Sequence, residues 1–306
     1  MLLASIAAAT LTYAFPVGSK SLYDFQVNLE GPIPMLGRAQ SQVEVKMVLE
    51  VAGLGAKEGG FAVTSDLTEM RASMGGVVLP FTVENVKAFF PKTNLLVAPT
   101  GKILKTDAPD VQLPVRLPGL DSKRLPDVSF LPVELPAEGI EVGKSFTFQK
   151  NLGGSEATFT VTPTAIDETK AEMNVKLSQS YETLETANGD ETKDEKAAVN
   201  RLKTELKGSG KFVFDRKLGL TKSLAADSLA VTEVTPVKGG VKSERRITTK
   251  IRVDRRETGA VVPPLNRPSS RHVFGWNLPE AVSGWIDRAE GGVWVVLRLF
   301  GIIGRN

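Results

Sequence analysis

Few residues of this 306-residue chain are of the types that carry out catalysis or bind metals. The chain has no cysteine and a single histidine, His272. The absence of cysteine excludes disulfide scaffolds, thiol nucleophiles and Cys-ligated zinc or iron–sulfur clusters, and one imidazole cannot form a multi-histidine metal site. His272 could serve as the base of a nucleophile–histidine–carboxylate triad, but it follows a Pro-rich segment, which favours a surface or packing role.

Carboxylates are the remaining candidates for chemistry. The acidic stretch at residues 182–195 lacks the ligand spacing of an EF-hand loop, although calcium binding stays open as an alternative. Asn188-Gly189 within it signals a tight turn instead. Any two of the 35 acidic residues could meet in space as a glycosidase pair. A carboxylate-based hydrolase is therefore the third alternative for function. The first expectation is that the chain is not an enzyme and binds no cofactor or metal.

Positive charge gathers late in the chain. Residues 238–256 contain eight Lys or Arg and two acids. Alternation places Arg246, Lys250 and Arg252 on the wet face of a strand, where they are candidates for contact with an anionic surface. No aromatic residue interrupts this stretch, so a nucleic-acid partner is not expected. The alternative is an edge strand that its charges protect from aggregation.

The C-terminal segment combines apolar and aromatic residues. Residues 279–290 predict an amphipathic helix, and the apolar run at 293–303 is too short to cross a bilayer. The segment could contact a membrane surface or an envelope protein, or pack on the body as a final strand or helix. The candidate contact residues are Trp276, Trp285, Ile286 and Trp294.

The N-terminus predicts export. Residues 2–11 are apolar, and small residues follow in Thr12-Tyr13-Ala14, as signal peptidase requires. Cleavage would leave Phe15 as the first residue. The expected location is therefore extracytoplasmic: periplasmic, cell-surface or secreted. No Lys or Arg precedes the apolar run, so a buried first strand or helix is the alternative.

Period-two alternation of apolar and polar residues dominates between these ends. It predicts antiparallel strands with one dry and one wet face. The clearest runs cover residues 23–29, 43–51, 171–181 and 247–253. Two internal helices are expected, at residues 82–90 and about 194–206, each followed by a strand, a turn with Gly101 or Gly219, and another strand. This order suggests an internal duplication, although β-rich halves can also match by chance.

A prolyl-rich stretch separates the two halves. The expected organisation is a signal peptide at 1–14, a first β-rich half at 15–108, a Pro-rich connector at 109–136, a second β-rich half at 137–257, and a linker with the Trp-bearing tail at 258–306.

A segment after the connector resembles a known pattern. Leu135-Pro136 precedes Ile140, Val142, Gly143, Ser145 and Phe146, and later come Gly210, Phe214-Asp215 and Gly219. This resembles uncharacterised bacterial exported β-rich proteins with an LPxxxVxVGxS[WF] segment. By architecture such proteins are similar to the lipoprotein-carrier superfamily, which implies a curved antiparallel sheet with helices over its concave face. The matched residues are structural turns, so the resemblance implies no functional residue.

The sequence therefore predicts a mainly β protein, with two related halves, each with one short helix, forming one large curved antiparallel sheet or sandwich. The expected function is non-catalytic: an exported envelope protein that binds an apolar or lipidic ligand, or an assembly partner. The alternative is a structural or interaction module of the cell envelope, anchored through the C-terminal tail. An apolar cavity inside the sheet would favour ligand binding, whereas a packed core would favour the structural module.

Overall fold

The computed structural model describes residues 9–32, 40–79, 82–87, 90–108 and 130–257. His272 and the predicted tail, with Trp276, Trp285, Ile286 and Trp294, lie outside the described residues. So does most of the predicted connector.

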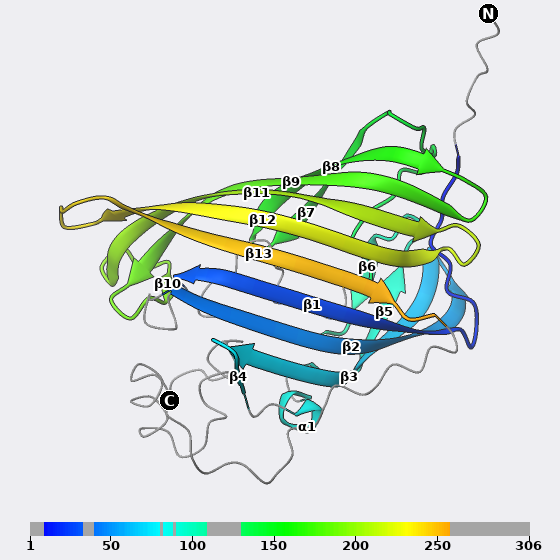
Figure 1. Ribbon diagram of the computed structural model, residues 1–306, viewed down its shortest axis with the longest axis horizontal. Coiled ribbons are helices and arrows are strands. Elements are labelled where there is room, and N and C mark those ends of the chain that lie inside the picture. Colours follow the sequence, from blue (N-terminus) through cyan, green and yellow to red (C-terminus); the bar gives the residue numbers. More distant parts are fainter. Residues whose placement is uncertain (1–8, 33–39, 80–81, 88–89, 109–129, 258–306) are drawn as a thin grey trace, which may run out of the picture.

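One large antiparallel sheet makes up the fold, as expected (Figure 1). Along the main path its strands follow the order β6-β5-β3-β2-β1-β13-β12-β11-β9-β8-β7, with β4 beside β3 and β10 beside β9. The strands of the first half are β1 (Lys20–Pro32), β2 (Gln40–Lys57), β3 (Gly60–Met74), β4 (Val77–Val78), β5 (Thr93–Val97) and β6 (Ile103–Thr106). Those of the second half are β7 (Phe146–Leu152), β8 (Ser155–Ile166), β9 (Lys170–Thr186), β10 (Glu191–Thr192), β11 (Ala198–Asp215), β12 (Leu220–Pro236) and β13 (Ser243–Arg255).

The two halves meet where the first strand pairs with the last. β1 lies between β2 and β13, and Phe25 is opposite Met47 on one side and Val253 on the other. All three side chains are buried, and they belong to the alternating series that the sequence predicts. Alternation thus sets the register, because a slip by one residue would turn each apolar series outward.

The inner face also buries chain that is not part of the sheet. Residues 9–15, here called the N-terminal segment, run across one end of the core. Tyr13 is fully buried: its hydroxyl donates to the Val133 carbonyl oxygen (3.0 Å), and its ring meets Phe214 edge-on at 5.1 Å. Burial raises the pKa of the Tyr13 phenol well above its usual value.

Two glycines leave the room that the N-terminal segment needs. A Cβ on Gly101 would lie 2.4 Å from the Tyr13 ring, and one on Gly219 would lie 2.8 Å from the Ala14 Cβ. Both glycines also adopt positive φ, at 88° and 65°, which L side chains rarely adopt. Cleavage after Ala14 would remove Tyr13 from this packing, so the two alternatives for the segment differ in whether Tyr13 fills this part of the core.

The two helices predicted from the sequence have different outcomes. The first exists as a single turn, α1 (Val83–Val86), with Val86 buried. The second is wrong: residues 198–206 belong to β11, which pairs along its length with β9 and β12. Val199, Leu202 and Leu206 have helical spacing, but the same residues also fit a period-two pattern in which Leu202 and Leu206 point inward. The strand wins because β9 and β12 supply hydrogen-bond partners for the backbone of β11 on both sides. The duplication rested partly on this second helix and stays a prediction.

The end of the predicted connector is not an open linker. Residues 130–135, here called the core strap, bury Phe130, Leu131, Val133 and Leu135 against the inner face. The hydroxyl of Thr221 donates to the Phe130 carbonyl oxygen at 2.7 Å, and Leu135 N–H donates to the Thr100 carbonyl oxygen at 2.8 Å. These hydrogen bonds satisfy backbone groups of the core strap, in place of the strand-to-strand hydrogen bonds that the prolines of this segment prevent.

Candidate functional site

A hollow of about 610 Å³ lies on the inner face of the sheet. Its volume is within the range of about 300–1,000 Å³ that is typical of small-molecule sites. The sheet supplies most of its lining, from β1, β13, β12, β11, β9 and β8, and β6, β7 and the core strap border it. The apolar lining residues are Phe25, Ile103, Pro132, Val133, Leu152, Phe159, Val175, Leu177, Leu224, Ala226, Ile251 and Val253.

Small residues on two adjacent strands form the floor of the hollow. Gly208 and Gly210 of β11 are opposite Ser228 and Ala226 of β12. A Cβ on Gly210 would come within 2.6 Å of the Ala225 carbonyl oxygen and 2.7 Å of the Ala226 Cβ. Glycine therefore lets β11 and β12 approach closely here, and it leaves the inner face without side chains at two successive inward positions.

Larger side chains close the hollow along these strands. On one side, Phe212 and Phe214 are buried in the main core with Tyr13. On the other side, Leu206 of β11 and Ala230 of β12 are paired and buried outside the main core. The hollow thus lies between two buried regions of the same sheet face.

Polar groups gather at the rim, beside the core strap. Lys150 of β7 is largely buried, and its Nζ donates to the Leu131 carbonyl oxygen at 2.9 Å. The same amine lies 4.0 Å from Glu134 Oε1 and 5.4 Å from the centre of the Phe148 ring. Lys150 therefore ties the strap to the edge strand over the hollow and places one positive charge at its border.

The acidic residues at the hollow do not form a facing pair. Glu134 lies on the strap beside Lys150, whereas Asp227 occupies an outward position of β12, between inward-facing Ala226 and Ser228. A glycosidase needs two carboxylates on opposite sides of one bond. No group of three or more His, Asp or Glu suited to a metal ion occurs among the described residues. What the hollow offers chemically is apolar surface with a charged rim.

A buried ion pair fastens the sheet beyond the hollow. Glu185 of β9 accepts from both terminal nitrogens of Arg245 of β13, at 2.6 and 2.9 Å, and from Asn200 Nδ2 at 2.7 Å. The strand order puts β12 and β11 between these partners. In a flat sheet three strand spacings would separate them by about 14 Å. The direct contact shows that the sheet is rolled inward at this end.

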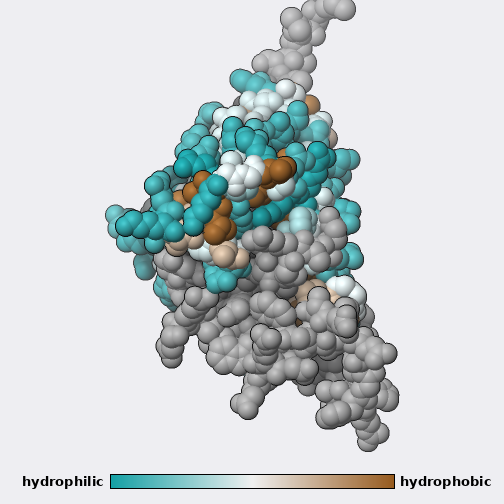
Figure 2. Space-filling view, turned by 90° about the vertical axis from the view of Figure 1, so that its left-hand side faces the viewer, coloured by the Kyte–Doolittle hydropathy of each residue, from teal (hydrophilic) through white to brown (hydrophobic). Residues whose placement is uncertain are grey.

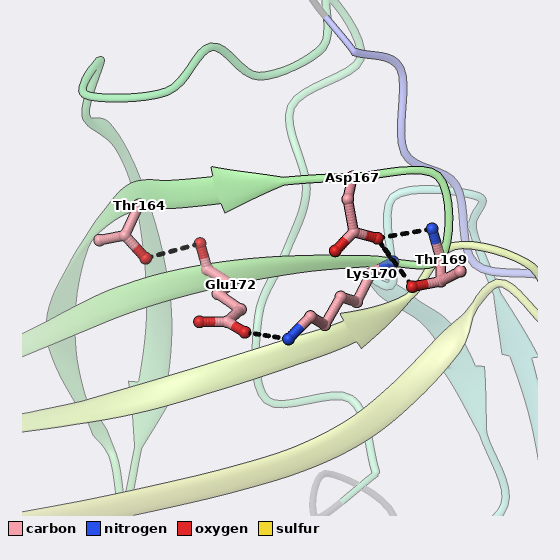
Figure 3. A network of polar contacts seen from close by, with 5 residues as sticks. All are labelled: Thr164, Asp167, Thr169, Lys170 and Glu172. Atoms are coloured by element: carbon pink, nitrogen blue, oxygen red, sulfur yellow. Dashed lines mark hydrogen bonds and ion pairs between the residues drawn. The ribbon is translucent and has the colours of Figure 1, made fainter.

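The opposite ends of the long strands are held by polar turns. In the β8–β9 turn, Asp167 accepts from the backbone N–H and the hydroxyl of Thr169, both at 2.7 Å, and from Lys170 N–H at 2.9 Å (Figure 3). These hydrogen bonds lower the pKa of Asp167 to about 2. The residues in Figure 3 stabilise the β8–β9 turn, and none of them lines the hollow.

The sequence-predicted site residues lie on other surfaces. Arg246, Lys250 and Arg252 are exposed on the outward side of β13, and Arg246 pairs with Glu244 at 2.6 Å. Glu185, one of the acids in the predicted acidic stretch, is buried by its pairing with Arg245. The residues that line the hollow were not predicted from the sequence. Gly208, Gly210 and Ala226 are small residues at inward positions of their strands, and this was the one signal that could have indicated the hollow.

Apolar surface is also exposed at one end of the molecule. Figure 2 faces the end where the β12–β13 hairpin projects in Figure 1, and it shows apolar atoms surrounded by hydrophilic ones. Val237 and Val241 in the turn of this hairpin are large hydrophobic side chains with 48% and 90% exposure. Within the described part of the chain, every helix is too short or too polar to span a bilayer.

The comparisons with known proteins give structural likenesses alone. No protein-family model matches the chain, and no curated protein matches it. A solved structure described as "Lipid-protein interactions in lipovitellin" is similar over 84% of this chain, with 14% identity and a TM-score of 0.46. The chain spans 28% of the length of that lipovitellin chain. DynF, from the dynemicin biosynthesis pathway of Micromonospora chersina, is similar over 83% of this chain and 87% of its own, with 7% identity and a TM-score of 0.19.

Proposed function

We propose that the protein is a non-catalytic binding protein that holds an apolar, lipid-like ligand in the hollow. The observation that carries this proposal is the hollow itself, about 610 Å³ of mainly apolar lining between two buried regions of one sheet face. A packed inner face would have favoured a purely structural module. Glycine, alanine and serine at the floor keep this space open, since larger side chains would fill it.

The arrangement of polar groups suggests how the ligand is oriented. The floor is uncharged, with the Ser228 hydroxyl as its one polar side-chain group, whereas the charged Lys150 and Glu134 lie at the strap. An apolar body on the floor would gain about 25 cal/mol for each Å² removed from water. A polar end, if the ligand has one, would lie at the rim beside these charges, because burying it unpaired on the floor would cost several kcal/mol.

Binding of a pyrene-labelled fatty acid to the full chain tests the proposal. We expect saturable binding with one site per chain, competition by unlabelled fatty acid, and a negative heat-capacity change in calorimetry, which marks the burial of apolar surface. Native mass spectrometry of protein purified from its host should show a retained small molecule. Non-saturable uptake of the probe, with no competition, would exclude a defined site in the hollow.

Export to an extracytoplasmic location is a separate part of the proposal. It is supported by the apolar run at residues 2–11 and the small residues that follow it. N-terminal sequencing of protein from the native host tests it. A mature chain that begins at Phe15 must fold without Tyr13, which here fills the end of the core.

A further inference from the structure

The outward face of the sheet carries a band of basic side chains. Pairing registers align one row of outward positions across seven strands, from β3 to β9. The row consists of Arg71, Lys46, Gln26, Arg252, Ala225, Lys211 and Asn174, in the order β3-β2-β1-β13-β12-β11-β9. It contains four basic residues and no acid. Figure 1 shows β1, β13, β12 and β11 side by side in front of β5, β6 and β7.

The next two rows continue the band. Lys250 and Lys176 lie in the adjoining row, and Lys207 lies in the one after it. The acids within these rows are Glu44, Asp227 and Glu30. The three rows together, here called the basic band, hold seven basic and three acidic side chains.

Most of the basic side chains in the band form no ion pair within the described part of the chain. Lys46 pairs with Glu44 at 3.1 Å. Among the described residues, no ion pair or side-chain hydrogen bond involves the other six, which are Arg71, Lys176, Lys207, Lys211, Lys250 and Arg252. All of these except Arg71 are exposed.

The acidic row on the other side of the band differs in this respect. It holds Glu69, Asp24, Asp254 and Glu172. Arg256 forms two hydrogen bonds to the Asp24 carboxylate, at 2.7 and 2.9 Å, and Lys170 pairs with Glu172. Asp24 and Glu172 are therefore neutralised by partners outside the band, whereas Asp254 lies close enough to Arg252 for their charges to interact. The other cations of the band remain available to an anion in solution.

We infer that the basic band binds a linear acidic polysaccharide. Strands lie about 4.8 Å apart, so the row from Arg71 to Lys211 extends about 24 Å with cations about 5–10 Å apart. An extended polyanion can follow such a row around the outside of a curved sheet. Gln26 lies between Lys46 and Arg252, Ser209 lies between Lys207 and Lys211 along β11, and Asn174 ends the row beside Lys211. Gln26 Nε2 donates to Glu44, so Gln26 offers its amide oxygen, and Asn174 and Ser209 offer an amide and a hydroxyl group that suit sugar hydroxyls.

The same face is poorly suited to other anionic partners. It carries no aromatic side chain in these rows, so nucleobases have nothing on which to stack. A convex face meets a flat bilayer along a narrow strip, and the only large apolar side chain in the three rows is Leu229. None of the seven basic residues of the band lines the hollow, although Ser209 and Asp227 border both, so the inference does not depend on the ligand in the hollow.

Charge removal at two positions of the band, with a matched control, tests the inference. The band variant is Arg252→Gln with Lys211→Gln, and the control is Lys238→Gln with Lys217→Gln, in the β12–β13 and β11–β12 turns. All four residues are exposed and both variants lose two positive charges. Polygalacturonate is the probe, titrated by calorimetry across a range of salt concentrations, and circular dichroism verifies that each variant is folded.

We expect the wild-type chain to bind polygalacturonate with an affinity that falls as salt rises. The band variant should bind at least tenfold more weakly at low salt, and its slope of log affinity against log salt should decrease by about 1.5, at about 0.7–0.9 per lost contact. The control should change the affinity less than twofold. Equal losses in both variants, or no binding at low salt, would overturn the inference. So would tighter, band-dependent binding to anionic phospholipid vesicles or to single-stranded DNA.

Discussion

The substitution Ala226→Leu is the sharpest test of ligand binding in the hollow. Ala226 lies on the floor opposite Gly210, so a leucine there can extend over the space that the glycine leaves. The adjacent residue provides a matched control, because Ala225 has the same side chain on the outward face of β12. Ala225→Leu adds the same three carbon atoms outside the hollow.

The expected magnitudes follow from the number of carbon atoms added. At about 0.8 kcal/mol for each buried methylene, three carbons contribute up to about 2.4 kcal/mol. Leucine at position 226 should therefore raise the free energy of unfolding by a part of this amount, as cavity-filling substitutions do. If it excludes the same apolar volume of ligand, the affinity for the pyrene-labelled fatty acid should fall by up to about 2.4 kcal/mol, or about 50-fold.

Two measurements on the same samples separate the outcomes. Urea denaturation gives the free energy of unfolding, and fluorescence titration gives the affinity. We expect Ala226→Leu to have a higher free energy of unfolding and a lower affinity than the wild type, whereas Ala225→Leu should bind like the wild type. Unchanged affinity in Ala226→Leu would place the ligand elsewhere. A loss of stability of 1–3 kcal/mol, typical of overpacking, would show that the floor has no free space.

Three further predictions concern contacts outside the hollow. Tyr13→Ala should lower the free energy of unfolding, measured by urea denaturation, by about 3–5 kcal/mol, as expected for a buried aromatic side chain. The control Val17→Ala, at an exposed position, should change it by less than about 0.5 kcal/mol. Equal effects of the two variants would show that the N-terminal segment is not part of the core. Arg245→Met should lower the free energy of unfolding by about 3–5 kcal/mol, because it leaves the buried Glu185 carboxylate without its cation. The control Arg246→Met removes an exposed ion pair and should lower it by less than about 1 kcal/mol. An Arg245→Met variant as stable as the wild type would contradict the rolled sheet. Because the pKa of Asp167 is lowered in the folded protein, its carboxylate stabilises the fold fully above the unfolded pKa of about 3.9 and progressively less as the pH falls toward about 2. The difference in free energy of unfolding between the wild type and Asp167→Ala should therefore shrink as the pH falls through that interval.

Alternation predicted most of the sheet correctly. The runs at 23–29, 43–51, 171–181 and 247–253 all lie in strands, and Val45, Met47 and Leu49 are buried as a series. Periodicity works here because one face of each strand is buried against the core. Val48 broke the predicted pattern and is nevertheless buried; a β-bulge follows it, at Val48/Leu49.

Segments without a regular period were beyond such reasoning. Four of the six side chains at residues 130–135 are buried, and contacts from Tyr13, Thr100, Lys150 and Thr221, all distant in sequence, hold the strap in place. The N-terminal segment is similar, because an apolar run that precedes a small-residue site is equally typical of a signal peptide and of a core segment. In both cases the burial depends on long-range partners that local sequence does not reveal.

The hollow arises from the pairing of two short series, and neither series alone indicates it. Gly208 and Gly210 interrupt the inward series of β11 between Leu206 and Phe212, which by itself suggests a bulge or a close approach. Ala226 and Ser228 interrupt the inward series of β12 between Leu224 and Ala230. Only the register, which sets Gly208 opposite Ser228 and Gly210 opposite Ala226, combines the two gaps into one space. A shift of two residues between β11 and β12 would keep every apolar side chain on the inner face and still move Leu206 or Phe212 opposite the small residues of β12. The binding site therefore depends on a finer feature of the pairing than the fold does.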